Sequence, residues 1–360
     1  FGIPGRGIDY TIEVPSTWQY NITWEQRLWG DSSIEIGYVG SRGSDLVQKS
    51  DINQVAPEDR LDFIRGNGGQ DNSAVRPYFT TNNRILYWEN RGKSEYDGLQ
   101  TQFRMNFGRG SLFQASYTWS KFKANTSVVS SSAGEENVQM TDRWNPDLDW
   151  GYADLHREHV FNASLIWNLP TFEGRGGFMQ HVLGNWTVGT VLAYSSGVPL
   201  TPYVASIGGL GGSGYLGTGY DGNNRPLRVS GQPCNGKGQQ ILNPDAYTIV
   251  GARLGDSTQG VKRGDCEGPD YFQLDLSLYK NIYLGSRVEA QFRIEIFNLT
   301  NQTNWIGSSV DTTIRPFDVE LDAPIESATT ITAATIPGNW GVATAVRDPR
   351  QIQLGLKLSF

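Results

Sequence analysis

Apolar and polar residues alternate strictly in several segments of this chain. Successive side chains of an extended strand point to opposite faces, so a period of two predicts a strand with one apolar and one polar face. A helix would instead repeat its apolar positions every three or four residues. Segment 351–360 has the clearest pattern, with apolar residues of one parity at Ile352, Leu354, Leu356, Leu358 and Phe360.

The same alternation recurs upstream, and the whole set predicts about nine strands of roughly 8–12 residues each. In residues 287–299, for example, Phe292 and Ile294 alternate with Arg293 and Glu295. Full charges on the polar parity indicate that this face contacts water. The segments are 17–26, 33–40, 99–107, 111–120, 160–169, 185–197, 273–280, 287–299 and 351–360.

The connections between the predicted strands are alternately short and long. The short ones are glycine-bearing turns at 29–31, 108–110 and 283–287, with a longer member at 170–184. The long ones cover roughly residues 41–95, 122–156, 198–269 and 300–349. Short periplasmic turns and long extracellular loops are typical of outer-membrane barrels. The alternative is a secreted β-sandwich or β-helix with an aromatic core, but such folds give no reason to place all long loops at one end.

Composition narrows the class of protein further. The 360 residues include 43 Gly, 16 Tyr, 15 Phe and 11 Trp, yet no apolar run approaches the roughly 18 residues that a transmembrane helix needs. A formal net charge of -7 without a basic stripe argues against nucleic acid as a partner. We therefore predict an all-β fold, an antiparallel up-and-down transmembrane β-barrel of the bacterial outer membrane. Residues 1–360 would form a single barrel segment whose apolar faces contact outer-membrane lipid.

The alternation of connections also predicts where the last strand points. It follows a long loop, so it runs toward the periplasmic side and places Phe360 at the periplasmic rim. The ring of Phe360 is expected in the aromatic girdle there, and its strand must pair with another strand to close the barrel.

Both cysteines lie in the predicted loop 198–269. Cys234 and Cys266 are therefore able to close a loop disulfide, which would indicate an oxidising compartment, while two free thiols are the alternative. We predict the disulfide. The glycine-rich part of this loop, residues 206–224, lacks the helix and the lysine of a phosphate-binding loop and is predicted to be flexible.

Residues 141–154, with the sequence TDRWNPDLDWGYAD, are the strongest candidate for ligand contact. They interleave aromatic rings with carboxylates, a mixture that suits sugars, peptides or a cation. The alternative is a packed loop that covers the mouth of the barrel. The candidate ligand-binding residues are Trp144, Asp147, Asp149, Trp150 and Tyr152.

No motif in the chain predicts an enzyme, a metal site or a cofactor. His156 and His159 are spaced for a metal site on a helix, but on a strand they point to opposite faces. The acidic residues are scattered over loops and polar faces, so no catalytic set can be assembled. Residues 263–265 have the sequence RGD, which resembles an integrin-binding tripeptide. A match of three residues arises easily by chance, so it predicts no such function.

Several of these segments resemble the C-terminal barrel of TonB-dependent receptors, in particular the large Oar-like receptors that carry a carboxypeptidase regulatory domain. The resemblance covers nearly the whole chain. Its most specific parts are the run R-x-E-x-F-N-L-x-N from Arg293 to Asn301 and the terminal Phe360. Other segments that carry it are WQYNITWEQRL, SEYDGLQTQFRMNFGRGSLFQASYTWSK, DLHREHVFNASLIWNLP and RDPRQIQLGLKLSF.

The resemblance implies a barrel of about 22 strands with a plug domain in its lumen, energised by TonB, that imports a scarce ligand such as a siderophore, an oligosaccharide or a peptide. This segment would supply the last strands, and the plug domain, TonB box and N-terminal strands are expected outside it. The resemblance further implies contact with the TonB complex through that N-terminal region and presentation of Phe360 to the barrel-assembly machinery. The alternative function is a surface-exposed adhesion or structural barrel without active transport, from which a TonB box would distinguish a receptor.

Overall fold

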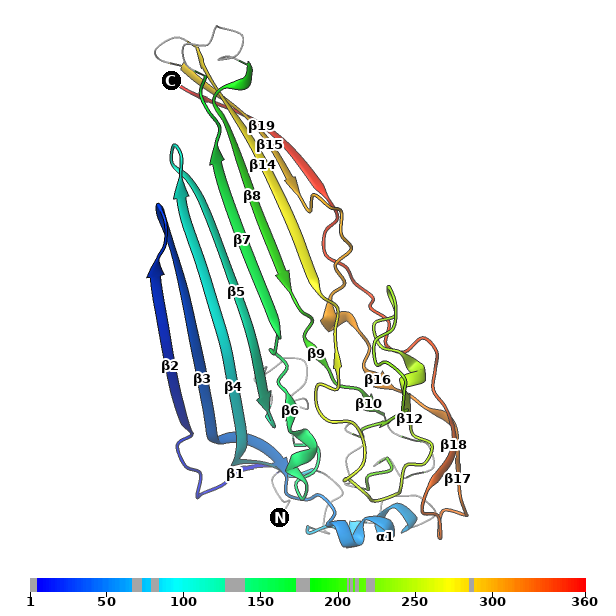
Figure 1. Ribbon diagram of the computed structural model, residues 1–360. Coiled ribbons are helices and arrows are strands. Elements are labelled where there is room, and N and C mark those ends of the chain that lie inside the picture. The colour runs from blue at the N-terminus through cyan, green and yellow to red at the C-terminus, as the bar shows by residue number, and fades with distance from the viewer. Residues whose placement is uncertain are drawn as a thin grey trace.

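A large antiparallel sheet dominates the computed structural model (Figure 1), which describes residues 5–66, 73–78, 84–126, 140–172, 182–205, 207, 210, 214–217, 224–284 and 288–360. Nine long strands follow one another across this sheet in chain order, and each neighbouring pair is antiparallel. They are β2 (Ser16–Arg27), β3 (Asp31–Asp51), β4 (Leu86–Phe107), β5 (Ser111–Ala124), β7 (His159–Asn168), β8 (Trp186–Ser195), β14 (Tyr271–Leu284), β15 (Val288–Phe297) and β19 (Gln351–Ser359). The predicted strands and their up-and-down order are confirmed.

Short elements lie at one end of the sheet, in the connections between the long strands and, for β1, before β2. The only α-helix in the described residues is α1 (Arg60–Arg65), and η5 (Pro146–Asp149) is one of several 3-10 turns. The other 3-10 turns are η1 (Pro57–Asp59), η3 (Ser73–Val75), η7 (Pro244–Ala246) and η8 (Gly307–Ser309). The short strands are β1 (Arg6–Ile8), β6 (Gly151–Tyr152), β9 (Pro199–Leu200), β10 (Tyr203–Val204), β11 (Leu227–Arg228), β12 (Tyr247–Thr248), β13 (Cys266–Glu267), β16 (Thr313–Ile314), β17 (Phe317–Leu321) and β18 (Ile331–Thr335). Within the described part of the chain, no helix is long and apolar enough to cross a bilayer.

The long connections all lie at one end of the strands and the shorter ones at the other (Figure 1). We call these the loop end and the turn end. The largest difference from the prediction is that β3 continues to Asp51 and β4 begins at Leu86, which shortens the expected loop 41–95. The register shifts between Gly43 and Val47, where Asp45 has a φ of 55°. Such a bulge interrupts the period of two, and this interruption hid the strand extension from the sequence pattern.

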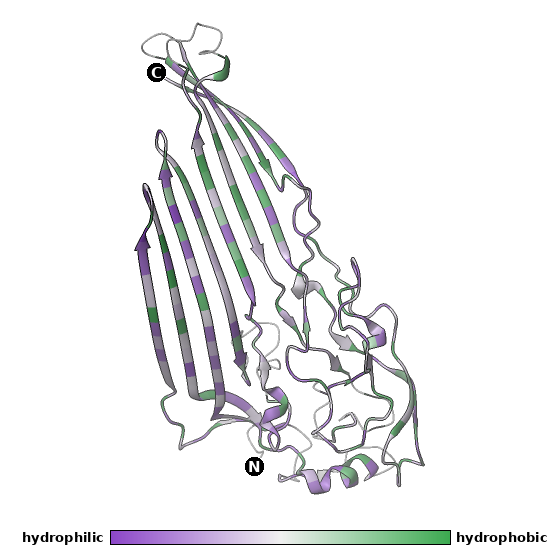
Figure 2. Cartoon of the chain, in the orientation of Figure 1, coloured by the Kyte–Doolittle hydropathy of each residue, from purple (hydrophilic) through white to green (hydrophobic). Residues whose placement is uncertain are grey.

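Apolar side chains share one face of the sheet because the register places them in continuous rows. One row joins Ile22, Tyr38, Leu99 and Trp119 across four strands. At the other side of the sheet, Leu278, Ile294 and Leu354 form a similar row. The alternation is visible as stripes along the strands in Figure 2. We call this apolar face the outer face.

The buried hydrophobic core lies outside the long strands. Among the buried hydrophobic residues that the structure describes, only Ala124 and Ala290 belong to them. Leu354 and Leu356 on β19 are instead 70% and 68% exposed. No other part of the described chain covers this apolar face. Such a face is expected where the strands contact membrane lipid.

Arginine at Leu354 is therefore expected to destabilise the protein in a bilayer by about 2–4 kcal/mol, because Leu354 is near the middle of β19 and on its outer face. Its neighbour Gln353 provides the control, since Gln353→Arg lies on the other face, opposite Glu295. The measurement is the amount of full-length protein in the outer-membrane fraction and its resistance to urea. Equal losses in the two variants would contradict the assignment of faces.

Candidate functional site

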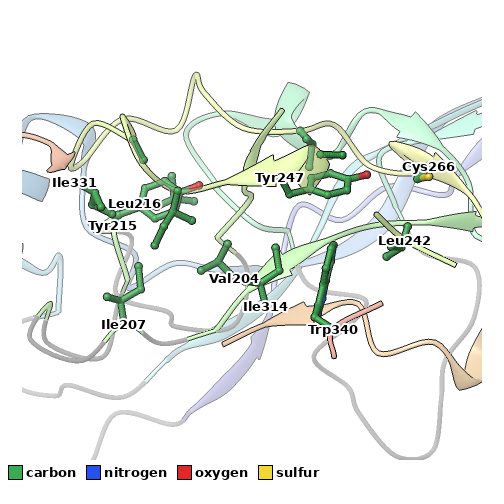
Figure 3. Close-up of a cluster of buried hydrophobic side chains, with 14 of the residues drawn as sticks. Val204, Ile207, Tyr215, Leu216, Leu242, Tyr247, Cys266, Ile314, Ile331 and Trp340 are labelled. Carbon is green, nitrogen blue, oxygen red and sulfur yellow. The ribbon is translucent and has the colours of Figure 1, made fainter. Parts of the chain in front are cut away.

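The connections at the loop end pack into one folded layer, which we call the loop cap; its described residues lie within 52–85, 125–158, 196–270 and 298–350. Its centre is a hydrophobic cluster contributed by all four connections (Figure 3). Tyr247 and Trp340 meet there edge to face, with ring centroids 5.4 Å apart. Tyr215 and Leu216, from the glycine-rich segment expected to be flexible, are 0% and 1% exposed. The described residues of that segment are therefore part of the core of the cap.

A buried ion pair joins the candidate segment 141–154 to α1. The Arg60 guanidinium donates to the Asp142 carboxylate over 2.7 Å, and the two side chains are 1% and 0% exposed. Arg60 also donates to the hydroxyl of Ser257 at 3.1 Å. The same Asp142 oxygen accepts the backbone N–H of Trp144 at 2.9 Å, which fixes the start of the turn that follows.

A second buried pair ties the candidate segment to the connection 196–270. Arg225 donates to Asp149 over 2.9 Å, with the side chains 2% and 6% exposed. The other carboxylate oxygen of Asp149 accepts the backbone N–H of Thr141 at 2.7 Å. The Arg225 guanidinium also lies 4.5 Å from the ring centre of Tyr203, in cation–π geometry.

A third pair uses the arginine of the RGD tripeptide. Arg263 donates to both carboxylate oxygens of Asp154, with the shortest distance 2.9 Å. Gly151 lies beside the Arg263 backbone so closely that a Cβ there would be 2.0 Å from the Arg263 carbonyl oxygen. The tripeptide is therefore a packed part of the loop cap in this structure, and its arginine is not presented at a loop tip.

The acidic residues of segment 141–154 thus hold three connections together. Removing one partner of a buried pair leaves an uncompensated charge away from water, which is far more costly than losing an exposed pair. The pairing partners lie 82, 76 and 109 residues apart in the chain. No local sequence signal marks Arg60, Arg225 or Arg263, so sequence reasoning did not identify them.

The five candidate ligand-binding residues do not share one surface. Both carboxylate oxygens of Asp149 are occupied inside the loop cap. Trp150 and Tyr152 are half-buried, and Tyr152 stacks on His156 with ring centroids 4.4 Å apart. Trp144 is 53% exposed and the side chain of Asp147 is exposed, while the Asp147 carbonyl accepts from Lys262 at 2.9 Å. Trp144 and Asp147 are therefore the members of the set that an external ligand reaches most easily.

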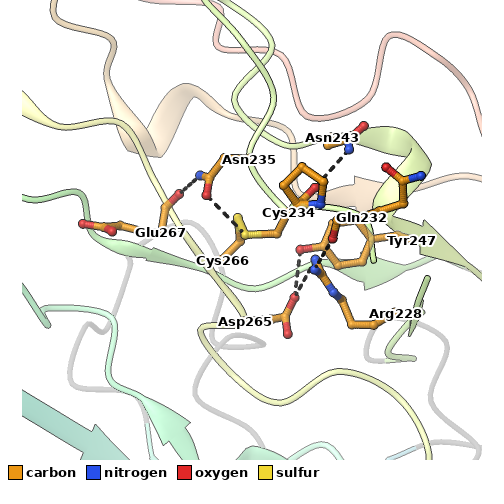
Figure 4. Close-up of a disulfide and its surroundings, with 10 residues drawn as sticks. Arg228, Gln232, Cys234, Asn235, Asn243, Tyr247, Asp265, Cys266 and Glu267 are labelled. Atoms are coloured by element: carbon orange, nitrogen blue, oxygen red, sulfur yellow. Dashed lines mark hydrogen bonds and ion pairs between the residues drawn. A yellow bond between two sulfur atoms is a disulfide. The ribbon is translucent and has the colours of Figure 1, made fainter. Parts of the chain in front are cut away.

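The two cysteines are joined in a disulfide inside the loop cap (Figure 4), with the sulfur atoms of Cys234 and Cys266 2.14 Å apart. Next to the bond, Asn235 donates to the Glu267 carbonyl at 2.7 Å. Closing a loop with a sequence separation of 32 contributes about 3–4 kcal/mol in the chain-entropy model. The bond therefore stabilises the folded form of the longest connection.

The two histidines of HREH have separate surroundings. The Nδ1 of His156 accepts the backbone N–H of Phe122 at 3.2 Å, and burial lowers the pKa of this imidazole. His159 instead contacts the Tyr117 hydroxyl at 2.8 Å. In the part of the chain that the structure describes, no three His, Cys, Asp or Glu side chains are grouped to hold a metal ion.

We expect Arg225→Met to destabilise the loop cap by about 3–5 kcal/mol, because it leaves Asp149 charged and buried without its partner. Arg315→Met is the matched control, since Arg315 and Asp311 form an exposed pair with side chains 63% and 47% exposed. That control should change stability by about 0–1 kcal/mol. Hydrogen exchange of the loop connections measures both effects, and equal protection in the two variants would refute a structural role for the buried pair.

A protein-family comparison agrees with this architecture. The family model described as an outer membrane beta barrel domain matches residues 2–353. No curated protein matches the chain at a significant level. Among solved structures, the outer membrane transporter YddB from Escherichia coli is similar over 97% of this chain with a TM-score of 0.42 and 10% identity, and the chain covers 33% of YddB. Because the family model matches almost the entire length of this chain, the chain belongs to the outer-membrane β-barrel domain family of the bacterial outer membrane.

Proposed function

We propose that this domain is the barrel part of a TonB-dependent, Oar-like receptor that imports a scarce ligand, either a siderophore, an oligosaccharide or a peptide, without enzymatic activity. The observation that carries the proposal is the loop cap. A barrel that only spans the membrane needs short connections, whereas this chain stabilises long ones with a hydrophobic cluster, a disulfide and buried ion pairs. A rigid surface presented by a membrane barrel suits recognition of a ligand.

The polar face of the sheet, opposite the outer face and called here the inner face, also supports the proposal of a receptor. Near the turn end, a hollow of about 330 Å³ is lined by Glu25, Arg27, Asp31, Arg104 and Asn106, among other polar residues. Charges of both signs on an inner surface suit contact with a polar protein domain. We propose that a plug domain in the N-terminal region of the protein fills this side and makes the contact with the TonB complex.

Nutrient uptake by the source bacterium tests the proposal. Strains lacking the gene for the full-length protein or the gene for TonB are compared with the wild type for uptake of labelled ferric siderophores, oligosaccharides and peptides. A receptor predicts that one of these ligand classes fails to enter both mutants. If uptake is unchanged in both, and the gene deletion instead reduces attachment of cells to surfaces, the adhesion barrel is the correct function.

Trp144→Ala is expected to weaken ligand binding by about 2 kcal/mol, because an exposed aromatic ring that stacks on a ligand commonly contributes this much. Trp29→Ala is the control, since Trp29 is also exposed but lies in the short turn between β2 and β3. Binding of the ligand identified by the uptake comparison is measured on whole cells, with both variants present at wild-type amounts. Unchanged affinity in Trp144→Ala would remove this residue from the site.

We also propose that Phe360 serves assembly through the barrel-assembly machinery. Its side chain is 99% exposed, at the turn end, and within the described residues β19 pairs on one edge only, with β15. Phe360→Asp should therefore lower the amount of protein inserted in the outer membrane, while the inserted fraction binds ligand normally. If Phe360→Asp is fully inserted but no longer binds ligand, the assignment of Phe360 to the end opposite the loop cap is wrong.

A further inference from the structure

One hollow on the outer face lies where that face changes from apolar to charged. It has a volume of about 360 Å³ and is lined by residues of β3, β4 and β5. Tyr38, Leu99 and Trp119 stand in one row across these strands. Asp97 and Lys121 form the next row on the same face, one step closer to the loop end. The hollow is therefore apolar on the side of the sheet centre and charged on the side of the loop cap.

The two charged residues that line this hollow, Asp97 and Lys121, differ in their partners. Asp97 accepts hydrogen bonds from the Arg42 guanidinium at 3.0 and 2.9 Å and from the Tyr38 hydroxyl at 2.6 Å. Its negative charge is thus already compensated by Arg42. Lys121 is exposed, and among the residues that the structure describes its side chain has no hydrogen-bond or ion-pair partner. The ammonium group of Lys121 is therefore a positive charge at the rim of the hollow that no carboxylate of the described residues pairs with.

Aromatic packing keeps the wall beside the hollow in place. Gly40 lies opposite Tyr20, and a Cβ on Gly40 would be 2.2 Å from the Tyr20 ring. The absence of a side chain at Gly40 lets this ring lie against β3, with its centroid 6.1 Å from that of Tyr38. The Tyr20 hydroxyl also reaches Asp97 at 3.5 Å. The wall is built from two rings and a compensated ion pair, so it does not depend on a bound ligand.

We infer that this hollow binds the phosphate-bearing headgroup of an anionic lipid of the outer membrane. The phosphate contacts Lys121, and the acyl chain runs along Tyr38, Leu99 and Trp119 toward the middle of the sheet. Tyrosine and tryptophan favour the membrane–water interface, and a basic side chain there attracts anionic headgroups. The inference requires only that the domain resides in the outer membrane, and it holds whether or not the protein transports a ligand.

Native mass spectrometry of the full-length protein tests the inference. The protein is placed in phosphatidylcholine nanodiscs that contain lipid A or the same lipid without its phosphates, and the retained lipid is counted. Wild type should prefer the phosphorylated form. Lys121→Gln should reduce this preference about fivefold. Trp119→Ala should instead lower the retention of both lipid forms by the same factor.

Lys357→Gln is the matched control, because Lys357 is an exposed lysine on β19 whose side chain is on the polar face of the sheet, away from the outer face. It should leave lipid retention unchanged. The inference is overturned if wild type retains both lipid forms equally, or if Lys121→Gln keeps the wild-type preference. Displacement of the lipid by added inorganic phosphate alone would also overturn it, since the hollow would then be a site for a free anion.

Discussion

The hydrocarbon of a bilayer offers no hydrogen-bond partner to a peptide group, and this constraint determines the arrangement of the whole chain. The nine long strands meet it with an unbroken antiparallel ladder from β2 to β19. The ladder in turn fixes the faces, because strands in register place side chains of one parity in common rows. A slip of one residue would bring Glu295 and Arg293 to the apolar face in place of Ile294. The alternation is therefore required on every strand at once.

The same chain orients its apolar side chains in two opposite ways. In the sheet they point outward and stay uncovered by the described residues, whereas in the loop cap they point inward around Val204, Ile314 and Trp340. The difference follows from the solvent, since lipid surrounds the strands and water surrounds the connections. Where the two regions meet, the outer face carries residues suited to both, such as Tyr38 and Asp97, whose hydroxyl and carboxylate are hydrogen-bonded to each other.

The sequence predicted the sheet well because a strand records its two faces locally, as an alternation that is readable within ten residues. Ile352 to Phe360 needs no knowledge of its neighbours to be identified as a strand. The loop cap leaves no such local record. The contact between Arg225 and Asp149 joins residues 76 apart, and the aspartate looks the same in sequence whether it faces a ligand or a guanidinium. The end of β3 was missed for a related reason, since the bulge near Asp45 breaks the period.

Burial of Asp142 and Asp149 leaves fewer side chains of segment 141–154 accessible from outside the loop cap. Carboxylates attract cations and hydroxyl groups only where they are accessible, and those of Asp142 and Asp149 are enclosed with their arginines. Because both pairs are far from water, they hold the turn between them in one conformation and rigidify the backbone that carries Trp144 and Asp147. A side chain on a rigid backbone loses less conformational freedom when it binds. Under the proposed receptor function, the acidic residues of this segment would therefore act on a ligand indirectly, by fixing the positions of the aromatic and acidic side chains that remain exposed.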